Sequence, residues 1–550
     1  MARTLDEATL RRQVASLLVV RASGHAGDRQ RRYPRWELTN AELKRLLANG
    51  VGGVILLGGS SVELQQRCLQ LRDWAGGPLL LCADVEEGVG QRFEGATWLV
   101  PPMALARLHA SNPDDAETLA EHYGRCTGRQ ARHCGLNWVL APIVDVNNNP
   151  ANPVINVRAW GEDPTTVTCL TLAFQRGLAQ HKVLACAKHF PGHGDTAVDS
   201  HLQLPVLPHN RDRLEQLELA PFRAAIAAGV DSVMTAHLQI PALDPNHPAT
   251  LSNVVLNDLL RSQLGFQGLV VTDALVMEAI RAHYSAGEAA VLAFAAGADL
   301  ILMPEDADAA ITAICDGLRS GRIPWKRLND SMERRRNALA KVESEPDLHS
   351  GGLELETPEE RALHDALLQA SWEHQGPRLQ PLKSGQGINL VRIDSVLACP
   401  QLPATAPALQ QPEQAGFRPL ITHPLAVSIW DEHNPTTPLA IERLGTGPVL
   451  VQLFLRGNPF RAGQEQNEPW GAALDQLQAA GRLAGLVIYG SPYAWDTLRT
   501  RLAPSIPAAY CPGQMPDAQA MVLRGLINSM NTTILNTTGM DAGPGAGFTD

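Results

Sequence analysis

The run "VLACAKHF", Val183 to Phe190, consists mainly of small and aliphatic residues and carries two polar ones, Lys188 and His189, near its end. Runs of this kind suit strands buried on both faces, as the strands of parallel sheets are. Each of seven further runs is likewise followed by a polar turn and a helix-like segment: "VASLLVV" (14–20), "VGGVILLG" (51–58), "PLLLCAD" (78–84), "LNWVLAPIVDV" (136–146), "VDSVMTAHL" (230–238), "GLVVTDAL" (268–275) and "ADLILMP" (298–304). Eight strands alternating with helices predict a TIM-like (β/α)8 barrel. An open Rossmann-like sheet is the alternative, but no G-x-G-x-x-G follows the first strand.

The 550 residues exceed one ordinary domain, and the periodicity is lost in "KVESEPDLHSGGLELE", residues 341–356. We therefore expect a barrel domain over residues 1–342, a linker over 343–356 and a second domain over 357–550. Thr357, Pro358 and Glu360 form a capping box that predicts the first helix of the second domain. A smaller α/β/α sandwich is predicted by "GINLVRI" (387–393), "PLAVSIW" (424–430), "GPVLVQLFL" (447–455), "LAGLVIYGS" (483–491) and "IPAAYC" (506–511), which alternate with helical segments such as "PDAQAMVLRGLI" (516–527). The tail "GMDAGPGAGFTD" (539–550) predicts disorder.

The composition excludes several classes of protein. Hydrophobic residues make up 45% and charged residues 19%, the balance of a globular protein. The net charge of −11 and the absence of a basic stripe argue against a nucleic-acid partner. Nine scattered cysteines without a C-x-x-C pair indicate reduced thiols. No apolar stretch reaches membrane-spanning length and no signal peptide is convincing, so we expect a cytoplasmic protein. The sequence does not indicate the oligomeric state.

Polar side chains stand where four of the predicted strands end. Asp84 ends one run, Lys188 and His189 end another, and His237 and Asp273 end two more. A single Asp in such a place is usually a helix cap or a turn residue. Because the carboxyl ends of barrel strands converge on one mouth, five titratable residues at four strand ends indicate a functional site there.

The loop that follows Lys188 and His189 is rich in histidines, glycines and aspartates. Five of its side chains are of a metal-ligating type, namely His189, His193, Asp195, Asp199 and His201, but their spacing matches no metal motif. In the favoured interpretation, the glycines of "FPGHGDT" permit positive φ and His193 is hydrogen-bonded inside a tight loop.

Asp199 and His201 suggest proton transfer, because a carboxylate two residues away can hold one ring N–H of an imidazole. An imidazole titrates near pH 6.5 and can serve first as acid and then as base. With the carboxylate of Asp273 at the same mouth, the set suits double-displacement glycoside hydrolysis.

Four motifs together resemble glycoside hydrolase family 3, specifically its bacterial β-N-acetylglucosaminidase branch. They are "KHFPGHGDTAVDSH" (188–201), "LAPIVDVNNNPANPVINVRAWGEDP" (140–164), "VMTAHLQIPALDPNHPATLS" (233–252) and "GLVVTDALVMEAI" (268–280). The resemblance covers roughly residues 15–340 and implies a TIM-like barrel, sometimes followed by an α/β/α sandwich.

This resemblance implies roles for individual residues. Asp273 would be the nucleophile, and His201, oriented by Asp199, would be the acid/base. The sugar would be held by Asp84, Arg92, Arg158, Lys188 and His189. The "DSH" element at 199–201 replaces the carboxylate acid that many β-glucosidases of the family draw from a later domain. No metal or cofactor is implied.

The sequence departs from the branch after the third strand. The branch usually shows D-x-E-G-G-R-V-Q-R, whereas this chain has "DVEEGVGQR", so Glu87 replaces a glycine and Val89 an arginine. Asp84 and Arg92 keep their places. We expect the altered middle of the loop to change aglycone preference.

The resemblance predicts a retaining exo-β-N-acetylglucosaminidase acting on cell-wall fragments such as GlcNAc linked to anhydro-muramic acid peptides. A β-glucosidase and a phosphorylase of the same family are the enzymatic alternatives. A noncatalytic sugar-binding protein and a metal-dependent hydrolase are alternatives of other classes.

Overall fold

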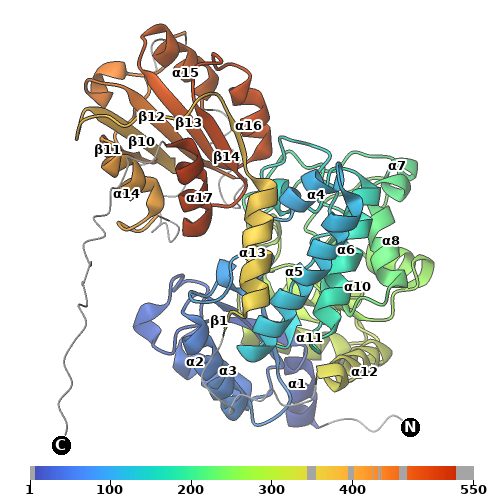
Figure 1. Cartoon of the computed structure of the whole chain (residues 1–550). Helices are drawn as coiled ribbons and strands as arrows, with labels where there is room; N and C mark the ends of the chain where they lie inside the picture. Colours follow the sequence, from blue (N-terminus) through green and yellow to red (C-terminus); the bar gives the residue numbers. More distant parts are fainter. Residues whose placement is uncertain are drawn as a thin grey trace, which may run out of the picture.

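The computed structural model describes residues 6–342, 355–393, 402–424, 426–431, 434, 436–456 and 468–527. Within them the chain forms a barrel domain and a smaller domain built on a second sheet (Figure 1). Helix α13 (Pro358–Ser371) lies between the two (Figure 1). The predicted linker, apart from residues 355 and 356, and the predicted tail lie outside the described residues.

Eight short parallel strands form the barrel. One ladder runs β4-β3-β2-β1-β8 and another runs β5-β6-β7. Parallel bridges from Trp138 to Leu184 and from Val271 to Leu300 join the two ladders, so the strands form a ring in chain order. The predicted barrel is confirmed, and each strand overlaps one of the eight predicted runs, with β1 continuing three residues past its run: β1 (Leu18–Ser23), β2 (Gly53–Leu57), β3 (Leu80–Ala83), β4 (Trp138–Val139), β5 (Cys186–Phe190), β6 (Ser232–Thr235), β7 (Leu269–Val271) and β8 (Ile301–Leu302).

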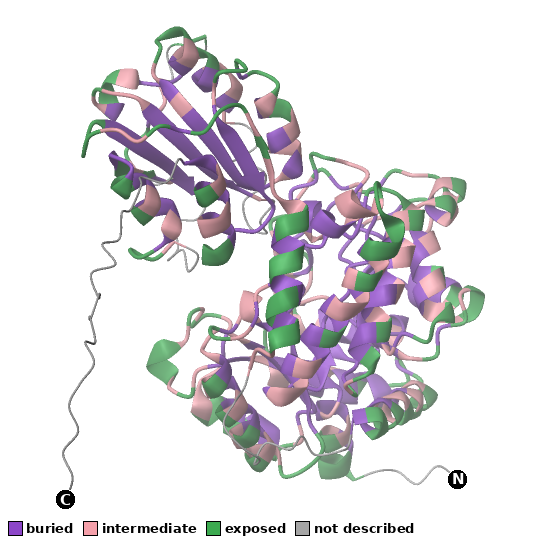
Figure 2. Cartoon of the chain, viewed as in Figure 1, coloured by how far each residue is buried: buried purple, intermediate pink, exposed green. Residues whose placement is uncertain are grey.

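Helices cover the outside of this ring (Figure 1). The strands are buried almost throughout, because one face fills the barrel interior and the other lies under the helices (Figure 2). The helices of the barrel domain are α1 (Glu7–Ala15), α2 (Asn40–Ala48), α3 (Ser61–Ala75), α4 (Met103–His109), α5 (Pro113–His133), α6 (Pro164–Ala179), α7 (Arg211–Gln216), α8 (Leu219–Ala227), the π-helix η5 (Val254–Gln263), α9 (Glu278–Arg281), α10 (Ala286–Ala296), α11 (Ala307–Arg319) and α12 (Trp325–Val342). Short 3-10 helices lie in the loops: η1 (Asp28–Gln30), η2 (Val89–Gln91), η3 (Asn156–Arg158) and η4 (Ala249–Leu251).

The second domain is a six-stranded sheet in the order β11-β10-β12-β13-β14-β9, and only β9 runs antiparallel. Alternate residues of β12 point to opposite faces: Val449 and Val451 pack with α15 and α16, whereas Leu450 and Phe454 pack with the cluster that includes α14 and α17. The predicted α/β/α sandwich is therefore confirmed. Its elements are β9 (Glu373–Gln375), β10 (Gly387–Ile393), α14 (Pro407–Gln414), β11 (Phe417–Thr422), the 3-10 helix η6 (Ile441–Leu444), β12 (Val449–Leu455), α15 (Trp470–Ala479), β13 (Leu483–Gly490), α16 (Pro492–Arg499), β14 (Ala508–Cys511) and α17 (Pro516–Leu526).

One predicted strand of this domain is wrong. The described residues of "PLAVSIW" form no strand, apart from a single bridge between Trp430 and Leu439, and Val427 is 84% exposed. The structure instead has a strand, β11, that begins seven residues before the predicted one. It lies at the sheet edge, where Pro419 is tolerated because one side of the strand has no partner. A proline among polar and exposed positions hides such a strand from a search for apolar runs.

Helix α13 begins with the predicted capping box, in which the Thr357 side chain accepts from Glu360 N and the Glu360 side chain accepts from Thr357 N. The same Glu360 carboxylate pairs with Arg129 of α5 and accepts from Gln130. The helix is thus anchored on the barrel from its first turn.

Among the described helices, none is both long enough and apolar enough to cross a membrane.

Candidate active site

Asp273 lies two residues after the end of β7, at the carboxyl ends of the barrel strands. Its carboxylate accepts a hydrogen bond of 2.7 Å from the backbone N–H of Ala274. Burial alone would raise the pKa of Asp273, but the positive charges that His237, His189 and His201 can carry outweigh burial and lower it. Three imidazoles from different parts of the chain therefore lie close to one ionised carboxylate.

Asp199 and His201 make the contact predicted from their spacing. Nδ1 of His201 lies 2.9 Å from Oδ1 of Asp199, and the same oxygen accepts from the backbone N–H of His201 at 2.8 Å. The Asp199 side chain is fully buried, whereas that of His201 is 19% exposed. Because a carboxylate only accepts, Nδ1 carries a proton, and Nε2 is the nitrogen through which His201 can exchange one.

The loop between β5 and this pair is shaped as the favoured interpretation predicted. His193 is buried, with Nδ1 2.8 Å from Thr196 Oγ1 and Nε2 3.1 Å from Ser200 Oγ. Gly192 has φ 132°, and a Cβ at Gly194 would lie 1.8 Å from the Val146 carbonyl oxygen. His193 thus holds the loop from inside.

The five side chains of the metal hypothesis do not gather around a common point. No three of them bring ligand atoms within 4.8 Å of one another. Asp195 instead pairs with His209 at 2.8 Å and with Arg213 at 2.9 Å, which ties the loop to α7.

His189 is held by a residue that sequence reasoning missed. Its Nδ1 lies 2.7 Å from Oδ2 of the fully buried Asp145, whose other oxygen accepts from the backbone N–H groups of His189 and His193. Asp145 is the last polar residue of the run "LNWVLAPIVDV", one position before its end, so a search for polar residues near strand ends would also have found it.

Lys188 lies between two carboxylates. Its Nζ is 2.8 Å from Asp84 and 2.7 Å from Glu86, and its side chain is only 1% exposed. Burial alone would lower the pKa of Lys188, but the two carboxylates outweigh it and the pKa is raised. Glu86, a residue missed at the sequence level, also binds Arg158 through two contacts of 2.9 Å.

Lys188, Asp84, Glu86 and Arg158 form a network in which one carboxylate is accessible to solvent. Asp84 is 37% exposed, while Glu86 is 3% exposed. Arg92 donates from Nε to the backbone carbonyl of Asp84 at 2.9 Å. The network therefore presents an accessible carboxylate beside cationic donors, which suits vicinal hydroxyl groups.

His237, the remaining strand-end residue, is buried and bonded on both nitrogens. Nδ1 lies 2.8 Å from Thr250 Oγ1, and Nε2 lies 3.1 Å from the carbonyl of Ala274, the residue that also binds Asp273. Burial lowers the pKa of His237. It supports the turn that carries Asp273.

The second domain contacts two of the loops that carry these residues. Glu87, the residue that departs from the family pattern, is buried and binds Arg456 of the second domain and the indole N–H of Trp98. Tyr493 of α16 accepts from Asn147 at 2.8 Å and donates to Glu162 at 2.7 Å. Glu87 was expected to alter the sugar-facing loop, and in the structure its side chain joins that loop to the second domain.

Comparisons with known proteins agree with this architecture. A profile of the Glycosyl hydrolase family 3 N terminal domain matches residues 9–337, and a profile of the Bacterial Glycosyl hydrolase family 3 C-terminal domain matches residues 380–528. The structure is similar to that of a glycoside hydrolase family 3 β-N-acetylglucosaminidase from Paenibacillus sp. str. FPU-7, with a TM-score of 0.72 and 30% identity over 94% of this chain and 97% of that one.

Two curated relatives match part of the chain. Beta-hexosaminidase A of Pseudoalteromonas piscicida is 36% identical over 343 residues, which are 58% of this chain and 57% of that protein. The chain thus spans less than two thirds of that relative. A beta-hexosaminidase of Stenotrophomonas maltophilia is 37% identical over 287 residues, 50% of this chain and 84% of that protein.

Proposed function

The chain belongs to glycoside hydrolase family 3, and from this premise we propose that it is a retaining exo-β-N-acetylglucosaminidase. The observation that carries the proposal is the position of the Asp199–His201 pair beside the ionised Asp273. One group can attack a sugar and the other can exchange a proton, which are the two parts that double displacement needs. The names of the matching relatives, β-hexosaminidases and a β-N-acetylglucosaminidase, support the choice of sugar.

In the first step the Asp273 carboxylate attacks the anomeric carbon and the bond to the glycosidic oxygen breaks. His201, protonated on both nitrogens, gives its Nε2 proton to that oxygen, and the aglycone leaves as an alcohol. The lowered pKa of Asp273 keeps the nucleophile ionised at neutral pH. Asp199 stabilises the imidazolium that gives the proton, because its carboxylate is buried against Nδ1.

In the second step neutral His201 removes a proton from water, and the resulting oxygen displaces Asp273 from the anomeric carbon. The products are the free sugar with its original anomeric configuration and a regenerated carboxylate. Both steps use the same nitrogen, so one imidazole serves as acid and base.

The terminal sugar would bind against the network beside Lys188. Asp84 would accept from two hydroxyl groups, and Arg92, Arg158, Lys188 and His189 would donate to hydroxyl or acetamido oxygens. The partial exposure of Asp84 beside a buried Lys188 supports this assignment. We further propose small cell-wall fragments that end in β-linked GlcNAc as substrates, and the cytoplasm as the place of action.

The decisive experiment compares turnover of aryl β-GlcNAc and aryl β-glucoside, with and without inorganic phosphate. We expect faster release from the GlcNAc compound, free GlcNAc as the product and no stimulation by phosphate. Faster glucoside turnover would remove the sugar assignment, and a sugar phosphate product would replace hydrolysis by phosphorolysis.

The covalent intermediate needs its own test. In His201→Ala, an activated aryl substrate still forms the glycosyl-enzyme, whereas its hydrolysis slows because the base is lost. Intact-protein mass spectrometry should then detect one added N-acetylglucosaminyl group, located on the peptide that contains Asp273. Steady turnover without any labelled Asp273 peptide would contradict the double-displacement route.

A further inference from the structure

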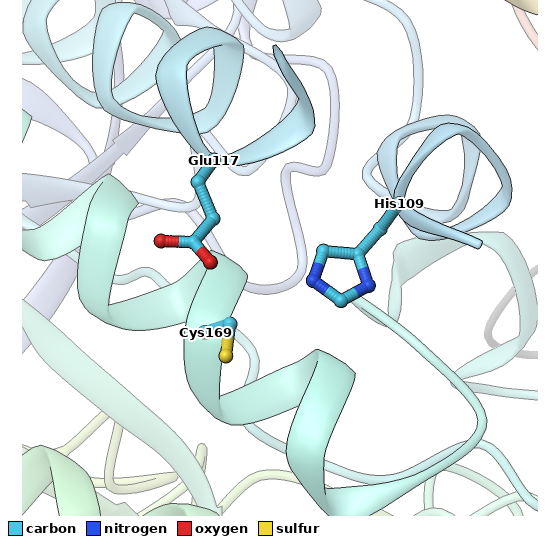
Figure 3. Close-up of side chains that lie close together, drawn as sticks. All are labelled: His109, Glu117 and Cys169. Atoms are coloured by element: carbon cyan, nitrogen blue, oxygen red, sulfur yellow. The ribbon is translucent and has the colours of Figure 1, made fainter. Parts of the chain in front are cut away.

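A second group of reactive side chains lies on the helical layer of the barrel, away from the strand ends. His109 is the last residue of α4, Glu117 lies in the first turns of α5, and Cys169 lies in α6. One ligand-type atom from each residue lies within 4.8 Å of the other two. Figure 3 shows the imidazole, carboxylate and thiol extending from three helices into a common space.

These three side chains are not used by the surrounding fold. None of them makes a side-chain hydrogen bond or an ion pair to another residue in the described part of the chain. All three are half-buried, and Cys169 is the exception among the described cysteines, because the other seven are buried. A partly accessible thiol therefore lies beside an imidazole and a carboxylate, and none of the three is engaged in a side-chain hydrogen bond or ion pair with the described residues.

The local charge is negative. The carboxylates of Glu117 and Asp163 both lie near the Cys169 thiol. Asp163, whose side chain caps α6, also lies near His109. The cation that acts on the thiol is Arg176, which is itself paired with Glu121. The site thus favours an added positive charge.

We propose that His109, Glu117 and Cys169 bind a divalent transition metal of the zinc class. Imidazole nitrogen, carboxylate oxygen and thiolate sulfur are together the ligand types that Zn²⁺ takes, whereas Mg²⁺ and Ca²⁺ take oxygen ligands. Three protein ligands leave the fourth tetrahedral position to water. On binding, the thiol of Cys169 releases its proton to solvent and the thiolate coordinates the metal, so affinity rises with pH.

A metal at this place joins three helices of the barrel. It fixes the end of α4 to α5 and α6, and α4 also carries Arg107, which pairs with Asp496 and Glu373 of the second domain. Because the metal binds the folded arrangement and not the separated helices, it raises the unfolding temperature, and above the Kd the stabilisation grows with the logarithm of the metal concentration. Its expected effect is on the stability of the folded chain and is separate from the strand-end site.

The test uses Co²⁺ as a spectroscopic substitute for Zn²⁺ on the full chain freed of metal by a chelator. We expect saturable binding of one equivalent, a sulfur-to-cobalt charge-transfer band in the near ultraviolet, and loss of the band when Zn²⁺ is added. Cys169→Ser should abolish the band. Glu117→Gln and His109→Gln should each weaken binding at least about tenfold.

The matched control is His122→Gln, which changes a half-buried imidazole of α5 that lies outside the three-residue set. It should keep the band and the affinity. Circular dichroism checks that each variant is folded, and the three ligand changes lie at half-buried positions on three different helices. Absence of stoichiometric binding, or an unchanged band in Cys169→Ser, overturns the proposal.

Discussion

The Glu87 carboxylate contacts the Arg456 guanidinium, at 2.5 Å and 3.2 Å, across the boundary between the barrel and the second domain. The two side chains are 1% and 11% exposed, so water screens the pair little. Glu87 stands in the same loop as Asp84, Glu86 and Arg92. The second domain thereby holds the loop on which the sugar-binding network depends.

Removing the cation of this pair should weaken both stability and substrate binding. In Arg456→Met the Glu87 carboxylate stays buried without its ionic partner, which costs about 3–5 kcal/mol of unfolding free energy. Because the loop loses an anchor, we expect KM to rise with a smaller change in kcat. Chemical denaturation and steady-state kinetics on aryl β-GlcNAc measure the two effects.

The double variant Glu87→Gln with Arg456→Met is the control for that experiment. It removes both charges, so it should recover part of the stability and of the KM. A positioning role is excluded if Arg456→Met lowers stability while KM and kcat keep their wild-type values.

Tyr493→Phe tests the second contact between the domains. The change removes the hydroxyl that accepts from Asn147 and donates to Glu162. In the sequence, Asn147 precedes Arg158 and Glu162 follows it. Loss of a hydrogen bond to a charged partner costs about 1.5–3 kcal/mol, so we expect a higher KM and a lower unfolding temperature. Tyr510→Phe is the matched control, because that hydroxyl binds Gly490 within the second domain. Equal KM changes in both variants would argue against a specific effect of Tyr493.

His193 should make stability depend on pH. Burial lowers its pKa to about 4 in the folded chain, against an ordinary value of 6.5. Between these values the unfolded chain binds more protons, so the contribution is complete above pH 6.5 and is lost as the pH falls toward 4, up to about 3 kcal/mol. His193→Gln should therefore show a shallower loss of unfolding free energy in urea titrations across this range. Parallel pH profiles of the two proteins would mean that His193 binds protons equally well in the folded and the unfolded chain, which contradicts a lowered pKa.

The leaving group distinguishes the roles of Asp273 and His201. Asp273→Asn should lose at least about 10⁴-fold in kcat/KM on every substrate, because no carboxylate attacks the anomeric carbon. His201→Ala should lose about 10²–10⁴-fold on substrates with poor leaving groups and much less in the first step on activated aryl substrates. Comparing kcat/KM for disaccharide and aryl substrates measures the difference. Equal losses on both types would remove His201 from the acid role.

Local patterns explain which parts of the structure could be predicted. The barrel strands were found because each is an apolar run buried on both faces, and Asp199 and His201 were found because their contact spans two residues. Strand β11 was not found, because an edge strand with Pro419 has no apolar run. Asp145 and Glu86 lie near the ends of predicted strands. Their sequence positions do not show that Asp145 holds His189, or that Glu86 joins Lys188 to Arg158.

No local sequence pattern could predict the partner of Glu87. Glu87 and Arg456 are 369 residues apart, and their contact depends on how two separately built sheets are placed. At the sequence level Glu87 was only an unusual residue in a sugar-facing loop. Charge and burial assign it a partner only when both domains are present.

Helix α13 has a consequence for how the molecule comes apart. Its residues Leu363, Leu367 and Leu368 belong to one continuous apolar cluster that includes the barrel core and one face of the second sheet, through Leu450 and Phe454. Unfolding of either domain would expose apolar surface on the other domain. Calorimetry should therefore record a single cooperative transition, and a fragment cut at the end of α12 should aggregate instead of behaving as an autonomous barrel.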